Sequence, residues 1–134
     1  MKPQLLFRAA LLMAFAWCVA PALAKDVYVI AHSALSASEA DIKEIYTGEK
    51  QISGGVKVLP TDNAAVQADF QAKVIKMEGN KYNAMWTKKS FRDGVAVPPV
   101  KGGDAEVAAY VKSTPGAVGY VSAPVEGVKV LGKY

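Results

Sequence analysis

Two short apolar runs constrain most strongly what this chain can fold into. They are Val27-Tyr28-Val29-Ile30-Ala31 and Ala117-Val118-Gly119-Tyr120-Val121, and neither alternates polar with apolar residues. A strand with one face in water shows that alternation, whereas a continuous apolar run is typical of a strand covered on both faces, as in parallel sheets. We therefore expect an α/β fold in which a twisted, mostly parallel sheet is flanked by helices.

Helical patterns lie between the two runs. Ser36 and Glu39 have the spacing of a capping box, which predicts a helix start, and Gly48 predicts the end of that helix. Its buried face is predicted to hold Ile42, Ile45 and Tyr46. After a turn at residues 53–55, residues 56–59 predict a short strand.

Three further helices and a last strand complete the pattern. The second helix is expected to start after Pro60, with Asp62 or Asn63 as its cap, and to end at Gly79-Asn80. Asp104 is expected to cap the fourth. The predicted buried faces are Val66, Phe70, Val74 and Met77, then Tyr82, Met85 and Trp86, then Val107, Tyr110 and Val111. Residues 128–131 predict the last strand, and the order of elements is that of an α/β domain.

Residues 1–24 have the pattern of a signal peptide. Lys2 and Arg8 give a positive start, an apolar stretch follows from Ala9 to Ala20, and Ala22-Leu23-Ala24 matches the small-x-small cleavage pattern. The apolar stretch is shorter than the roughly 20 residues that span a bilayer. An uncleaved anchor is therefore the weaker alternative.

Cleavage is expected before Lys25, which leaves residues 25–134 as a single periplasmic domain without stable membrane insertion. A lipid anchor on Cys18 is disfavoured because Phe15-Ala16-Trp17 places a bulky ring before it. Cys18 is the only cysteine, so the exported protein is expected to have neither a disulfide nor thiol chemistry. It has to be held together by core packing.

The charge and the aromatic residues argue against a nucleic-acid partner. Without Lys2 and Arg8, 14 basic residues stand against 12 acidic ones, so the net charge is about +2 instead of +4. Basic and aromatic side chains do alternate in residues 81–92, a pattern that also occurs in proteins that bind single strands. A helix with a buried aromatic face and a charged outer face explains the same pattern more simply.

Little in the sequence indicates catalysis. His32 is the only histidine, so no histidine cluster can form a zinc site, and its place at the end of the first strand is more simply a half-exposed loop position. No nucleophile elbow, phosphate-binding loop or dinucleotide fingerprint occurs. We expect no enzyme activity, no cofactor and no metal.

The candidate ligand site is the turn from the second strand into the second helix. It consists of Thr61, Asp62, Asn63, Ala64, Ala65 and Val66. If the helix starts here, the backbone N–H groups of Ala64, Ala65 and Val66 are unpaired donors that suit an oxyanion. Thr61 and Asn63 would add side-chain donors, and Asp62 could accept a proton from the ligand. An ordinary capped helix explains these residues equally well.

Several segments together resemble one lobe of the type II periplasmic binding proteins, specifically the phosphate-binding component of ABC transporters. They are Asp41-Ile42-Lys43-Glu44-Ile45-Tyr46-Thr47-Gly48-Glu49-Lys50, the strand into Thr61-Asp62, the Phe70 helix, Trp86, and Thr114-Pro115-Gly116-Ala117-Val118-Gly119-Tyr120-Val121. They occur in the family's order. The resemblance implies a twisted sheet flanked by helices, with ligand held at helix N-termini.

The resemblance also implies which residues of the phosphate loop are present. The family's loop is similar to Arg-Ser-Asp-Gly-Ser-Gly-Thr, and Asp62 matches its acidic position. Pro60 stands where the family has Arg, and residues 64–66 replace Ser, Gly and Thr. Residues 25–134 have room for one lobe, whereas the family closes two lobes around its ligand.

Two functions follow from these observations. The first is an exported solute-binding protein for phosphate or another small oxyanion, in ABC transport or sensing, with a membrane transporter as partner. The second is a one-lobe accessory module that docks on an envelope protein and binds no solute strongly.

Overall fold

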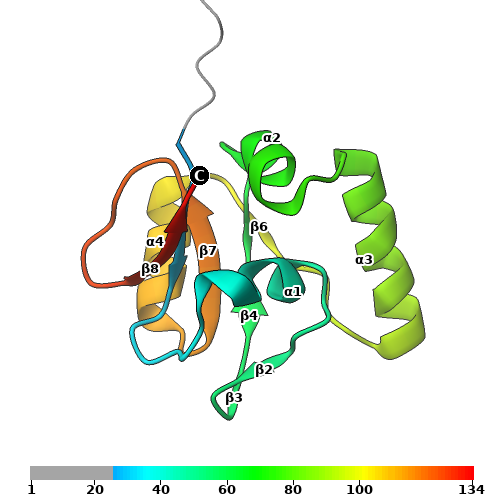
Figure 1. Cartoon of the computed structure of the whole chain (residues 1–134), viewed down its shortest axis with the longest axis horizontal. Helices are drawn as coiled ribbons and strands as arrows, with labels where there is room; N and C mark the ends of the chain where they lie inside the picture. The colour runs from blue at the N-terminus through cyan, green and yellow to red at the C-terminus, as the bar shows by residue number, and fades with distance from the viewer. Residues whose placement is uncertain (1–25) are drawn as a thin grey trace, which may run out of the picture.

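A computed structural model describes residues 26–134 of the protein, so the predicted signal peptide lies outside the described residues. The strands are β1 (Tyr28–Ala31), β2 (Ile52–Ser53), β3 (Val56–Lys57), β4 (Leu59–Pro60), β5 (Asp62–Asn63), β6 (Val100–Lys101), β7 (Ala117–Val121) and β8 (Lys129–Lys133). The helices are α1 (Ile42–Tyr46), α2 (Gln67–Phe70), α3 (Gly79–Asp93) and α4 (Asp104–Ser113). A 3-10 turn (Glu39–Asp41) precedes α1, and a π-helical segment (Gln71–Ile75) extends α2 (Figure 1).

The expected α/β fold class is confirmed, and its main sheet has the strand order β4-β7-β1-β8. The strand directions are more mixed than expected. β4 runs parallel to β7, and β5 runs parallel to β6 in a separate pair, but β1 is antiparallel to both of its neighbours. The apolar runs indicated burial correctly, but burial on both faces depends on what covers the sheet and not on the direction of the neighbouring strand.

Both faces of the central strands are buried, and successive residues of β1 enter different cores. Val29 and Ala31 belong to the larger core with α1, the α2 region and α3, while Ile30 belongs to the smaller core under α4. β7 divides in the same way. The structure places α4 on one face of the sheet and the larger core on the other (Figure 1).

Close approach of α4 to β7 depends on a glycine. A Cβ atom at Gly119 would lie 2.5 Å from Cγ1 of Val107, which is closer than side chains can pack, and 3.2 Å from Cγ2 of Val111, which is a tight contact. The missing side chain therefore lets α4 lie directly on the strand.

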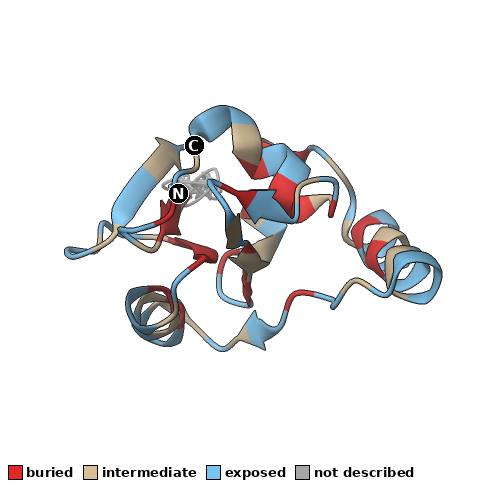
Figure 2. Ribbon diagram, turned by 90° about the horizontal axis from the view of Figure 1, so that it is seen from below, coloured by how far each residue is buried: buried red, intermediate tan, exposed pale blue. Residues whose placement is uncertain are grey.

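The predicted helix α3 is confirmed, including its buried face. Tyr82 and Trp86 are buried, Met85 is packed at the edge of the core, and the helix ends at Gly94 in a left-handed conformation. In Figure 2 the buried residues of α3 lie on one side of the helix and the exposed ones on the other. None of the helices in residues 26–134 combines the length and apolar character needed to cross a bilayer.

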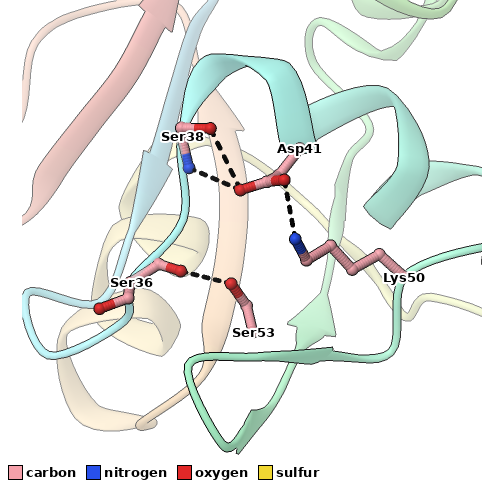
Figure 3. A network of polar contacts seen from close by, with 5 residues as sticks. All are labelled: Ser36, Ser38, Asp41, Lys50 and Ser53. Carbon is pink, nitrogen blue, oxygen red and sulfur yellow. Dashed lines mark hydrogen bonds and ion pairs between the residues drawn. The ribbon is translucent and has the colours of Figure 1, made fainter.

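The start of the first helical region differs from the prediction. Asp41 closes the turn by accepting hydrogen bonds from the backbone N–H and hydroxyl of Ser38, at 2.9 and 3.2 Å, so the cap is Ser38 and not Ser36. Lys50 also donates to Asp41, at 2.8 Å. Ser36 instead accepts a hydrogen bond from Ser53 on its carbonyl, which ties this loop to β2 (Figure 3).

Three other expected boundaries are also wrong. Residues 56–59 form parts of two strands, because β3 pairs with β2 in a hairpin while β4 joins β7. Gly79 begins α3 and does not merely end the preceding helix. Gly103, not Asp104, is the N-cap of α4.

Candidate functional site

Residues 61–66 leave β4 and form a strand before any helix begins. Asp62 and Asn63 are β5, which pairs with β6. The N–H of Asp62 donates to the carbonyl of Pro99 at 2.9 Å, and the N–H of Ala64 donates to that of Lys101 at 2.9 Å. One of the three expected ligand-facing amides, that of Ala64, is therefore part of a backbone ladder.

The next two amides are paired within the segment. Ala65 donates its N–H to Oδ1 of Asn63 at 3.0 Å, and Val66 donates to the carbonyl of Asn63 at 3.2 Å. Helix α2 starts only at Gln67 and has no side-chain cap. The expected helix start with unpaired amides at residues 64–66 is wrong, because β6 and Asn63 use those donors; anion binding by Thr61 to Val66 itself stays a prediction.

Asp62 is the chemically most unusual residue of the segment. Its side chain is 2% exposed, and both carboxylate oxygens accept hydrogen bonds from tyrosines. Tyr82 donates at 3.1 and 3.0 Å to Oδ1 and Oδ2, and Tyr120 donates to Oδ1 at 2.9 Å. Burial raises the pKa of Asp62 to about 6, against the opposing effect of the two tyrosine hydrogen bonds.

The tyrosines around this carboxyl are held in their protonated form. Burial, and then the charge of Asp62, raises the pKa of Tyr46, Tyr82 and Tyr120 well above the ordinary value. Tyr46 does not contact the carboxylate but donates to the backbone carbonyl of Thr61 at 2.9 Å. The three hydroxyls therefore serve as hydrogen-bond donors that fix residues 61 and 62.

Aromatic rings pack against one another beside the tyrosines that surround Asp62. The rings of Phe70 and Tyr120 are stacked with their centroids 3.8 Å apart, and the ring of Tyr46 packs edge-on against Phe70 at 4.6 Å. Asp62 lies buried beside these packed rings, and this burial is the physical reason for its raised pKa.

Asn63 is a junction between three parts of the chain. Its Nδ2 donates to Oδ1 of Asp104 at 2.8 Å and to the carbonyl of Tyr120 at 2.9 Å. Asp104 in turn accepts from the N–H of Ser122 at 3.1 Å. The side chain of Asn63 is therefore fully engaged in holding β5 to β7 and to the start of α4.

The structure thus divides the six predicted site residues into two groups. Thr61, Asp62, Asn63 and Val66 are buried, and only Ala64 and Ala65 are exposed. Thr61 directs its hydroxyl to the carbonyl of Pro99 at 2.7 Å. The side-chain donors predicted to face a ligand face the protein interior.

Sequence reasoning missed Tyr82, Tyr120 and Asp104 as partners of this segment. The two tyrosines were expected only as apolar packing residues. The available signal was the run Thr61-Asp62-Asn63, because three polar residues directly after a buried strand require partners. Nothing in their spacing indicates which distant hydroxyls supply them.

His32 lies in the turn after β1, as expected, and is half-buried. Its Nδ1 accepts a hydrogen bond from the N–H of Ala34 at 3.1 Å, so it stabilises its own turn. Across residues 26–134, no three His, Cys, Asp or Glu side chains are grouped so that they could hold a metal ion.

Comparison with solved structures identifies the fold. The protein is similar to a phosphate ABC transporter substrate-binding protein from Clostridium perfringens with bound phosphate (TM-score 0.58, 14% identity, 80% of this chain and 44% of that chain). It is also similar to an ABC-type phosphate transport receptor from Vibrio cholerae (0.50, 14%, 80% and 45%) and to PstS from Borrelia burgdorferi (0.50, 16%, 72% and 40%). No protein-family model and no curated protein sequence matches the chain.

The chain spans less than half the length of each of these solved structures. The likeness therefore shows that the chain has the fold of part of these structures, in the size of a single lobe, which confirms the fold class expected from the sequence.

Proposed function

We propose that this protein is an exported, non-enzymatic one-lobe module that docks on an envelope partner and does not by itself capture phosphate at residues 61–66. The observation that supports the proposal is that the backbone N–H donors of this segment are already hydrogen-bonded within the protein. The N–H groups of Asp62, Ala64, Ala65 and Val66 all donate to acceptors within the protein. An anion that approached this segment would have to break a hydrogen bond for each one it gained, which leaves little net free energy.

The carboxyl of Asp62 supports the same proposal. An acidic residue that accepts the proton of a bound phosphate has to face the ligand. Asp62 is buried and already accepts from Tyr82 and Tyr120. It therefore acts as a structural acceptor inside the lobe.

A second candidate function, weak phosphate or oxyanion binding in service of an ABC transporter, is favoured by the fold likeness. One of the similar solved structures holds phosphate, although this chain covers only 44% of it. Ala64 and Ala65 are exposed and so mark where an anion would approach. Two or three hydrogen bonds in an open half-cleft would give an affinity of about millimolar order.

Titration calorimetry and amide NMR of the exported protein with phosphate, sulfate and acetate separate the two functions. We expect no heat and no shift of the amide resonances of residues 61–66 below about 1 mM phosphate. Saturable phosphate binding in the micromolar range, with shifts at those amides, would replace the docking function by solute capture. The variant Ala64→Ser adds one exposed hydroxyl and tests whether a weak site can be strengthened.

The export part of the proposal has a separate test. Intact-mass analysis of protein recovered from the periplasm should show a chain that begins at Lys25. A mass that includes Met1 or Cys18 would contradict cleavage at Ala24.

A further inference from the structure

A cavity of about 200 Å³ lies beside β4, before the chain reaches residues 61–66. Its apolar lining includes Ile45, Val58, Leu59, Trp86, Val95 and Pro98. The walls come from α1, from β4, from α3 and from the segment that connects α3 to β6. None of the residues of the segment 61–66 lines this cavity. This cavity, called the groove below, is therefore separate from the predicted ligand segment 61–66.

One wall of the groove is an irregular backbone segment that ends in an extended residue, Val97. Residues 95–97 connect α3 to β6 without regular secondary structure (Figure 1), and Pro98 restricts Val97 to extended conformations. Within residues 26–134, the N–H groups of Val95, Ala96 and Val97 donate to no other group. The side chain of Val97 is 50% exposed. The edge thus has free donors and an uncovered apolar side chain.

The charged groups at the groove have one sign. Lys50 and Lys57 line it, and no Asp or Glu does. Lys50 is paired with Asp41, but Lys57 forms no ion pair with any residue that the structure describes. The surroundings therefore attract a partner that carries negative charge.

We propose that this groove binds an extended, acidic peptide segment of an envelope partner, which adds as a strand along residues 95–97. The proposal rests on the proposed docking function and names its surface. Unpaired N–H groups of an extended edge are satisfied when another strand pairs with them. Successive side chains of a strand point to opposite faces, so apolar ones at alternate positions would enter the cavity. The acidic ones between them would stay at the rim, where the long, exposed side chain of Lys57 can reach them.

The probe is the acetylated and amidated hexapeptide Glu-Val-Glu-Val-Glu-Val, titrated into ¹⁵N-labelled exported protein. We expect saturable shifts of the amides of residues 95–97 and of the indole N–H of Trp86, with a Kd of about 0.1–1 mM. The same peptide with Lys in place of Glu should bind at least about tenfold more weakly, because it places like charges at the rim. N-methylation of alternate valines should abolish the shifts by removing strand pairing.

Two matched lysine variants test whether Lys57 contributes the positive charge that binds the acidic peptide. Lys57→Gln should weaken the acidic peptide by about two- to fivefold, the range of an exposed ion pair, while Lys112→Gln on the outer side of α4 should leave its Kd unchanged. The proposal would be overturned if the Glu and Lys peptides bound equally well, or if the two variants had equal effects. It would also be overturned if the amides of residues 95–97 showed no shift at about 5 mM peptide, a concentration above the expected Kd. Micromolar phosphate binding at residues 61–66 would overturn the docking function instead, so the two failures are distinguishable.

Discussion

The hydroxyl of Tyr120 on β7 donates a hydrogen bond of 2.9 Å to Oδ1 of Asp62 on β5, and so joins the main sheet to the small parallel pair. No cation accompanies the buried carboxylate within hydrogen-bond distance among residues 26–134. Among the described residues, the hydrogen bonds that its side chain accepts come from the hydroxyls of Tyr82 and Tyr120.

Stability should depend on pH through Asp62. Its folded pKa of about 6 lies above the unfolded value near 4, so the folded protein binds this proton more tightly. The stabilisation is fully present below about pH 4 and is lost as the pH rises through about 6, a change of about 3 kcal/mol. Urea unfolding at pH 4 to 7 should show this decrease. Asp62→Asn should flatten the profile, and an unchanged profile in that variant would assign the titration to another group.

Removing either tyrosine hydroxyl should destabilise the ionised carboxylate. Tyr82→Phe or Tyr120→Phe should cost about 1–3 kcal/mol at pH 7 and raise the pKa of Asp62 further, because each deletes a hydrogen bond to the charged form. The fall in stability should still begin near the unfolded pKa, but it should extend about one pH unit higher and be larger than in wild type. Tyr28→Phe is the control, since the ring of Tyr28 contacts Lys133 and not Asp62. A loss of stability with an unchanged pH dependence of the unfolding free energy would indicate that only packing was lost.

Trp86 should be structural. Its side chain is 2% exposed and lies against Gly48, where the positive φ of +72° requires a glycine. Trp86→Ala should lower the free energy of unfolding by about 3–5 kcal/mol. Phe91 is on the same helix but 90% exposed, so Phe91→Ala should stay within about 0.5 kcal/mol of wild type. Similar losses in both variants would contradict the assignment of the buried face.

Gly119 should tolerate no side chain while Val107 is present. Gly119→Ala places a Cβ atom 2.5 Å from Cγ1 of Val107, so we expect a loss of about 1–3 kcal/mol. Val107→Ala removes the clashing methyl, so the double variant should be more stable than the sum of the two single changes predicts. Additive losses in the unfolding free energy would mean that the helix simply shifts away.

The sequence predicted the buried elements better than the connections between them. Apolar runs and helical spacing identified β1, β7 and the buried faces of α1, α3 and α4, because burial acts on each segment locally. Strand direction was not predictable in this way, since a run such as 27–31 is equally apolar beside a parallel or an antiparallel neighbour. The antiparallel pairing of β1 with β8 depends on residues about a hundred positions apart.

The candidate site shows the same limit. The sequence drew attention to residues 61–66, and their polar side chains do gather in one place. Whether the N–H groups of this segment face a ligand or another strand depends on residues 99–101. A local sequence pattern does not show that these distant residues pair with the segment. A capped helix and a strand edge were both compatible with Asp62 and Asn63 until their partners were known.

The pairing of β1 with β8 also has a consequence for how the lobe assembles. Val27 and Tyr134 exchange backbone hydrogen bonds of 2.9 and 2.8 Å, so the sheet is complete only when residues from the two ends of the domain have met. Such long-range closure is slow compared with the formation of local helices. A chain whose last residues have not yet been synthesised therefore has an open edge at β1, and that edge stays open until β8 pairs with it.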